Sequence, residues 1–160
     1  MAFDAFLKIE GIDGESTDKI HPGEIEIQSF SWGVENTGGT IGGGGGGTGK
    51  ATPQDFHFNS AVSKAAPSLM LACATGRHFQ KATLTCRKAG ATSLAAEFLK
   101  IRLDDCLISS YNTEGTAESD VGGPTDQFSI NFTKIDFLYT VLKTGETVES
   151  SFDFSAFVGT

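Results

Sequence analysis

Three stretches of this sequence alternate apolar and polar residues, and in each stretch the apolar positions shift by one residue partway along. The three series run Ile25, Ile27, then Phe30, Trp32, Val34; Leu99, Ile101, Leu103, then Cys106, Ile108; and Phe128, Ile130, Phe132, then Ile135, Phe137, Tyr139. Successive side chains of a strand point to opposite faces, so each shift requires a bulge or a sharp bend. Long strands that bend midway are typical of small barrels, whose strands must coil around the core. The sequence therefore predicts a mainly β protein, folded as a small closed or rolled β-barrel.

Shorter segments add further strands and one short α-helix to this predicted architecture. The remaining strands are expected at residues 3–10, Phe56–Phe58, Ala82–Cys86 and Phe152–Phe157. The helix is expected to begin at Pro67, because proline at the first helical position loses no hydrogen bond, and to end before Gly76. Its apolar stripe would consist of Leu69, Met70, Cys73 and Ala74. A helix this short is unstable alone, so we expect it to dock on the sheet.

The charge balance excludes several classes of partner. The chain has 20 acidic and 12 basic residues, a formal net charge of −8. A protein that binds a phosphate backbone needs a positive surface, so no nucleic acid is expected as a partner. No segment is long and apolar enough to span a bilayer, so no membrane insertion is expected. The first residues lack the features of a signal peptide, which favours folding in the cytoplasm with Cys73, Cys86 and Cys106 reduced.

A glycine-rich segment, residues 36–50, interrupts the alternating pattern. Fixing its fifteen backbone units would cost about 15–30 kcal/mol, and Ile41 is the only large apolar side chain available to offset this. We therefore expect an extended loop that is mobile in the isolated subunit and ordered by main-chain contact with a neighbour. A linker and an idle hairpin loop are the alternatives. The candidate contact residues are Ile41, Gly42, Gly43, Gly44, Gly45, Gly46, Gly47, Thr48 and Lys50.

The same segment nearly matches a phosphate-binding loop, G-x-x-x-x-G-K-[ST]. Gly44, Gly49 and Lys50 fit the motif, but Ala51 stands where a hydroxyl must reach magnesium. That loop must also open a helix, whereas Pro53 and an alternating strand follow here. Nucleotide binding through Gly44–Lys50 is thus a weaker hypothesis than a contact loop.

No other residue pattern predicts catalysis, a metal site or a cofactor. His21, His57 and His78 lack the close ligand pairs of a zinc site and are interpreted as surface or strand-edge residues. Asp104 and Asp105 are neighbours on a predicted strand, so their carboxylates would point to opposite faces rather than act together. The chain is therefore not expected to be an enzyme.

Several groups of residues, in order over nearly the whole chain, carry a resemblance to a known family. The groups are Lys8–Ser16 with Asp18, His21 and Ile25; Ser29–Gly33; Pro67–His78; Arg87–Gly90; Leu107–Tyr111; and Ser129–Phe132. In this combination they resemble the Hcp family (haemolysin-coregulated protein). The glycine-rich segment lies where that family has its extended loop.

The resemblance implies a β-barrel with a short helix that assembles into hexameric rings around a wide channel. In the family, the rings stack into the inner tube of the type VI secretion system of Gram-negative bacteria. Residues 1–160 would form a single Hcp-like β-barrel domain with no C-terminal effector extension. The implied partners are copies of the chain itself, sheath proteins, the spike protein at the tube tip and secreted effectors. The chain would be cytoplasmic before firing, then secreted to the extracellular medium or a target cell without a signal peptide.

One segment joins the residue pattern to this implied function. Phe30 and Trp32 share one face of a strand, and Ser29, Ser31 and Gly33 share the other. We expect the large face to be barrel core and Ser29 and Ser31 to line the ring channel and contact effectors. The opposite assignment would put Trp32 in the channel or at a subunit seam. The alternative function is an extracellular binding module, such as an adhesin or lectin.

Overall fold

The computed structural model describes residues 1–37, 50–118, 122–156 and 158–160. Its elements, in chain order, are β1 (Phe3–Ile9), β2 (Ile25–Ile27), β3 (Ser29–Ser31), β4 (Val34–Asn36), β5 (Ala51–Pro53), β6 (Phe56–Ala61), α1 (Ala65–Thr75), β7 (His78–Lys88), the 3-10 turn η1 (Leu94–Ala96), β8 (Glu97–Glu114), β9 (Thr125–Asn131), β10 (Lys134–Thr140), β11 (Thr147–Asp153) and β12 (Val158–Gly159). In these ranges no helix has the length and apolar character needed to cross a membrane. The prediction of a mainly β protein with one short α-helix is confirmed.

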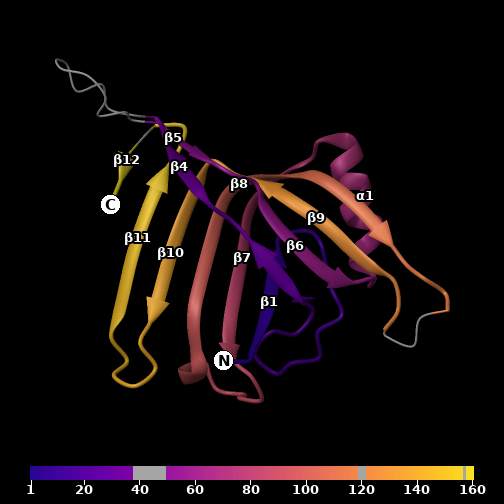
Figure 1. The fold of residues 1–160 in the computed structure, drawn as a ribbon, viewed down its shortest axis with the longest axis horizontal. Helices are drawn as coiled ribbons and strands as arrows, with labels where there is room; N and C mark the ends of the chain where they lie inside the picture. The colour runs from indigo at the N-terminus through magenta and orange to yellow at the C-terminus, as the bar shows by residue number, and fades with distance from the viewer. Residues whose placement is uncertain (38–49, 119–121, 157) are drawn as a thin grey trace.

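Antiparallel pairing runs in one path from β2 through β1, β7, β8, β9 and β6 to β3. Only Gln28 separates β2 from β3, and its amide donates to the Asn59 carbonyl of β6 at 2.8 Å. The path therefore returns to the segment on which it began, and the sheet rolls into a barrel. β10, β11 and β12 continue from β8 as an extension at one end of the molecule (Figure 1).

The sharpest corner of the barrel lies at Asp105, in the middle of β8. Residues 99–104 of β8 pair with β10, whereas residues 107–114 pair with β9. Asp105 has a φ of 50°, and among the described residues it is the one non-glycine with a positive φ. Beside it, the amide and hydroxyl of Thr133 both donate to the Asp104 carbonyl at 3.1 Å, between β9 and β10. The parity shift predicted in β8 and the one predicted near Thr133 therefore lie next to each other, on neighbouring chains at the same corner.

Only β8 carries its parity shift within a continuous strand. The shift near Gln28 divides β2 from β3, and the shift near Thr133 divides β9 from β10. In both places the chain exchanges one neighbouring strand for another, so the ladder is interrupted. The prediction of three long strands is corrected to one long strand and two pairs of short ones.

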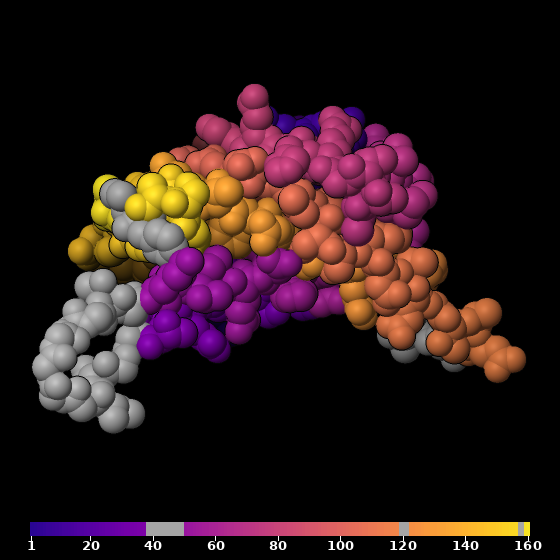
Figure 2. All heavy atoms as spheres, turned by 90° about the horizontal axis from the view of Figure 1, so that it is seen from above, coloured from indigo at the N-terminus to yellow at the C-terminus, as the bar shows by residue number. Residues whose placement is uncertain are grey.

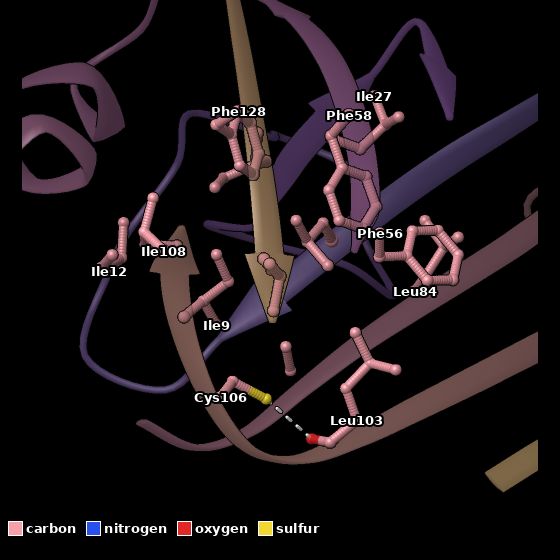
Figure 3. Packing of buried hydrophobic residues seen from close by; sticks show 14 of the residues in the cluster. Ile9, Ile12, Ile27, Phe56, Phe58, Leu84, Leu103, Cys106, Ile108 and Phe128 are labelled. Atoms are coloured by element: carbon pink, nitrogen blue, oxygen red, sulfur yellow. Dashed lines mark hydrogen bonds between the residues drawn. The ribbon is translucent and has the colours of Figure 1, made fainter. Parts of the chain in front are cut away.

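The core is built around connected aromatic rings. Nine phenylalanines and one tryptophan lie in successive contact, with neighbouring centroids 4.8–6.2 Å apart. The rings are Phe3, Phe30, Trp32, Phe56, Phe58, Phe98, Phe128, Phe132, Phe152 and Phe154. Figure 3 shows Phe58 and Phe128, from neighbouring strands, in the same cluster as Leu84 and Ile108. Such ring pairs each add about 0.5–1.5 kcal/mol beyond the area they bury.

α1 begins two residues before the expected start, at Ala65. The Ser63 hydroxyl accepts a hydrogen bond from the Ala65 amide at 3.2 Å, which satisfies one free donor of the first turn. Gly76 ends the helix as predicted, with a φ of 66° that favours glycine. The predicted apolar stripe is partly wrong, because Met70 and Ala74 are exposed. The buried face of the helix consists of Ala65, Ala66, Leu69 and Ala72.

Two of the short predicted strands differ from the observed ones. β7 extends well beyond Ala82–Cys86 at both ends, because it pairs with β1 on one edge and β8 on the other. The predicted strand at Phe152–Phe157 lies instead at Thr147–Asp153, followed by a turn at residues 154–156. The Asp153 carboxylate accepts hydrogen bonds from the amides of Ser155 and Ala156, which holds that turn.

The corner at Asp105 gives a test of the fold. Asp105→Val should lower the free energy of unfolding by about 1–2 kcal/mol, because a β-branched residue is disfavoured at positive φ. Asp105→Gly should keep the stability of the original chain within experimental error. Urea unfolding would measure both. His78→Ala is the control, because it removes the 3.1 Å contact between His78 and Asp105 and leaves the backbone unchanged. Equal losses in the Val and Gly variants would contradict the backbone explanation.

Candidate functional site

The outer surface of β3, β6, β9 and the far half of β8 forms one polar face. Strand pairing places His57 beside both Ser31 and Ser129, and Asn59 beside both Ser29 and Gln127. We call this surface the polar face; its residues are Ser29, Ser31, Asp55, His57, Asn59, Ser110, Asn112, Glu114, Gln127, Ser129 and Asn131. The centre of the polar face carries no charge while His57 is neutral. The carboxylates of Asp55 and Glu114 lie toward its margins.

Hydrogen bonds join the side chains of this polar face across the strands. Asn59 donates to the Ser29 hydroxyl at 2.8 Å, and the Ser110 hydroxyl is hydrogen-bonded to the buried hydroxyl of Ser129. At the margins, Asn131 donates to Asp55 at 2.9 Å, and Gln127 donates to Glu114 at 3.3 Å. These bonds fix the donors and acceptors of the face on rigid strands.

The opposite side of the same strands belongs to the core. Trp32 is half-buried against Phe56 and Phe132, with ring centroids 6.1 and 6.2 Å away. Ser29 and Ser31 are exposed. The prediction that the large residues face the barrel core is therefore confirmed, and Trp32 does not lie on the polar face.

A shallow hollow of about 240 Å³ lies in the middle of the polar face. Its walls are His57, Phe58, Asn59, Ser110, Asn112, Gln127 and Phe128. Sequence reasoning selected only Ser29 and Ser31, because it could not say which strands lie beside them. The alternation of His57 and Asn59 with Phe56 and Phe58 is the signal that could have added β6 to the site.

The residues on either side of the predicted contact loop form a two-stranded hairpin. β4 pairs with β5, and the Lys50 carbonyl accepts from the amide and hydroxyl of Thr37, both at 3.4 Å. Ile41, Gly42 to Gly47 and Thr48 lie outside the described residues. Ala51 begins the strand β5, whereas a phosphate-binding loop would continue into a helix at that position.

An ion pair between Asp18 and buried Arg87 holds the loop between β1 and β2 against the barrel. The sequence analysis did not predict this pair. Arg87 of β7 is buried and donates to both carboxylate oxygens of Asp18, at 3.0 and 2.7 Å. The Asp18 carboxylate also accepts from the amides of Ile20 and His21. Hydrogen bonding to Arg87, and then to these two amides, holds the pKa of Asp18 well below its usual range against the opposing effect of burial.

His21 belongs to the same cluster and is buried, so its interpretation as a surface or strand-edge residue was wrong. Its ring stacks on Phe6 at a centroid distance of 4.6 Å, and the Arg87 guanidinium carbon lies 5.0 Å from the centroid of the same Phe6 ring. Its nitrogens lie 2.8 Å from a Glu24 oxygen and 2.7 Å from a Glu97 oxygen. His57 and His78 are exposed on strands, as predicted.

The cysteines and the paired aspartates have structural environments. Cys73, Cys86 and Cys106 are free thiols. Burial raises the pKa of Cys86 and of Cys106 to about 12, so both thiols are poor nucleophiles. Asp104 and Asp105 form the corner of β8, at the parity shift between Leu103 and Cys106 for which the sequence predicts a bulge or bend.

The comparisons with known proteins agree with this fold. A family model described as the type VI secretion system effector Hcp matches residues 6–139. Protein hcp1 of Pseudomonas aeruginosa strain PAO1 is 41% identical over 139 residues, which cover 87% of this chain and 84% of that protein. Hcp1 from Salmonella typhimurium aligns over 100% of both chains with a TM-score of 0.81 and 31% identity. A solved type six secretion system protein aligns over 99% of this chain and 100% of its own, with a TM-score of 0.88 and 25% identity.

The rolled barrel with one docked helix and these matches define a protein of type VI secretion systems. More particularly, the chain belongs to the Hcp family, as its sequence motifs indicated. This is a family of secreted, structural tube proteins rather than of known enzymes.

The Asp18–Arg87 pair predicts how stability depends on pH. The pKa of Asp18 is lower in the folded chain than in the unfolded chain, where it is about 4. The pair therefore stabilises the fold fully above about pH 4 and loses this effect as the pH falls further. Asp18→Asn should lower the thermal midpoint at pH 7, because buried Arg87 loses the carboxylate that accepts two of its hydrogen bonds and keeps only the more distant Asp4 carboxylate, 3.8 Å away. Its midpoint should also fall less steeply below about pH 4 than that of the original chain.

Thermal unfolding between pH 2 and 8 would measure both effects. Asp13→Asn is the matched control, because Asp13 is an exposed carboxylate in the same loop. If the thermal midpoints of the original chain and of Asp18→Asn fall equally steeply below about pH 4, the role given to the Asp18–Arg87 pair is contradicted.

Proposed function

We propose that this chain is a structural subunit of the type VI secretion inner tube and forms hexameric rings that stack. In this proposal the polar face lines the ring channel and carries or chaperones effectors. Ser29, Ser31, His57, Asn59 and Gln127 would meet the cargo. The observation that carries the proposal is the polar face itself, a sheet surface rigidly backed by the aromatic core.

The chemistry of this face suits a channel through which cargo must be both held and released. Its donors and acceptors are short side chains, and the charged Asp55 and Glu114 are already hydrogen-bonded to neighbours. Contacts of this kind are directional but individually weak, about 0.5–1.5 kcal/mol each. Serines are the smallest residues of the face, and two of them, Ser29 and Ser31, are exposed and leave space for bound protein.

The remaining parts of the proposal concern assembly and export. Ring stacking would use the extended loop, through Ile41 to Thr48 and Lys50, whose glycines allow close main-chain contact. The tube would meet the sheath proteins around it and the spike protein at its tip. The subunit would be cytoplasmic before firing and would then leave the cell with its effectors, without a signal peptide.

The polar face makes a prediction for Ser31. Negative-stain images of the purified protein should show rings, and Ser31→Gln should leave the rings intact. The longer side chain should reduce effector co-purification several-fold, because it occupies the space that cargo needs. Ser68→Gln is the control, since Ser68 is exposed on α1, away from the polar face.

Three results would contradict the proposal. Full effector retention by Ser31→Gln would remove the channel role of this face. A strictly monomeric protein at high concentration, or export that continues after the contractile sheath is disabled, would favour an independent secreted binding module.

A further inference from the structure

Strand register arranges the centre of the polar face as two rows of side chains that run across the strands. Figure 2 shows the segment that includes β6, in purple, at the surface along one side of the molecule. The first row, which we call the carboxamide row, consists of Ser29, Asn59, Gln127 and Asn112, from β3, β6, β9 and β8 in turn. The second row consists of Ser31, His57, Ser129 and Ser110, from the same four strands. The register therefore places three carboxamides side by side on neighbouring strands.

The carboxamide row keeps hydrogen-bonding capacity that the fold does not use. Each carboxamide has two N–H donors and an oxygen that accepts. Asn59 uses one donor on the Ser29 hydroxyl at 2.8 Å, and Gln127 uses one on Glu114 at 3.3 Å. Within the described part of the chain, no residue bonds to the carboxamide of Asn112, which is exposed. All three carboxamides line the 240 Å³ hollow, so they can both donate to and accept from a molecule that lies in it.

The spacing of polar side chains along each strand matches the repeat of an extended polypeptide. Asn59 and His57 of β6 are two residues apart and point to the same side, as do Gln127 and Ser129 of β9. Since a strand rises about 3.3–3.4 Å per residue, such side chains lie about 6.6–6.8 Å apart. The amides and carbonyls on one edge of an extended segment also recur every second residue, and hence at the same distance. An extended segment that lies along the strands would therefore meet the polar face in register.

The composition of the face disfavours other kinds of contact. Among the described residues that line the hollow there is no Asp, Glu, Lys or Arg, so the hollow offers no charged partner to a charged group. Contacts between folded proteins commonly depend on Trp, Tyr or Arg anchors seated in pockets. The residues of the polar face include none of these three types, and Trp32 lies on the core side of β3. The face is therefore better suited to neutral hydrogen bonds than to ion pairs or aromatic anchors.

We propose that the carboxamide row binds the main chain of an extended, unfolded segment of the cargo protein. This inference rests on the proposed function and names the part of the cargo that the polar face holds. A carboxamide carries the same donor and acceptor groups as a peptide unit, so the row pairs with the backbone of any sequence. Because these hydrogen bonds join neutral groups, salt screens them little.

A pair of synthetic peptides tests this recognition on the purified, assembled protein. The first is a short fluorescent peptide of glycine, alanine and serine. The second has the same side chains, but esters replace its central main-chain amides, which removes N–H donors on both edges without adding bulk. By fluorescence polarisation, the ester peptide should bind about tenfold more weakly than the amide peptide. The affinity of the amide peptide should change less than about twofold between roughly 50 and 500 mM NaCl.

Near-isosteric changes test the carboxamide row itself. The double variant Asn112→Leu/Gln127→Met keeps the size of both side chains and removes their donors and acceptors. It should still form rings, and its affinity for the amide peptide should fall about tenfold. Gln80→Met is the matched control, because Gln80 is an exposed carboxamide on β7, outside the polar face. It should bind the peptide like the original chain.

Equal binding of the amide and ester peptides, or full affinity in the double variant, would overturn main-chain recognition. Rings that retain effectors but bind neither peptide would also overturn it, because the face would then hold a folded surface of the cargo. Binding that is lost at high salt would assign the contact to charged groups instead. Failure of the proposed function is a different result, in which the original chain forms no rings or retains no effector.

Discussion

The bend of β8 at Asp105 is the constraint on which the rest of the structure depends. A single strand must pair with β10 before the bend and with β9 after it, while β7 follows its other edge. Asp105 provides the left-handed backbone that the bend requires, and Thr133 ties the neighbouring chain to it. Because of this corner, one strand helps to build both the rolled barrel and the extension of β10–β12.

The corner gives the molecule two surfaces of different chemistry. After the corner, the outer side of β8 joins β9, β6 and β3 in the polar face, with the aromatic core behind it. Before the corner, the core side of β8 continues onto β10 and β11, where Phe137, Tyr139 and Val148 are exposed. Polar groups on rigid strands suit reversible contact with cargo.

The sequence predicted features that depend on local pattern. Parity shifts located the corner at Asp104–Asp105, and the alternation around Trp32 assigned its face to the core. Features that depend on distant residues were missed: Asp18 is 69 positions from Arg87, and His21 is 76 from Glu97. His21 was interpreted as a surface residue because its neighbours in the sequence give no sign that it is buried. The close contact at Gly14 is similar, since a β-carbon there would lie 2.4 Å from the Glu24 carbonyl oxygen.

We propose above that this Hcp-family chain closes into a ring with its polar face inward. A cryo-electron microscopy reconstruction of the purified protein would test it most directly, because side-chain density shows which strand faces line the channel. We expect a sixfold ring whose channel wall carries Ser31, His57 and Gln127. A ring with these residues on its outer rim, or with Trp32 facing the channel, would contradict it.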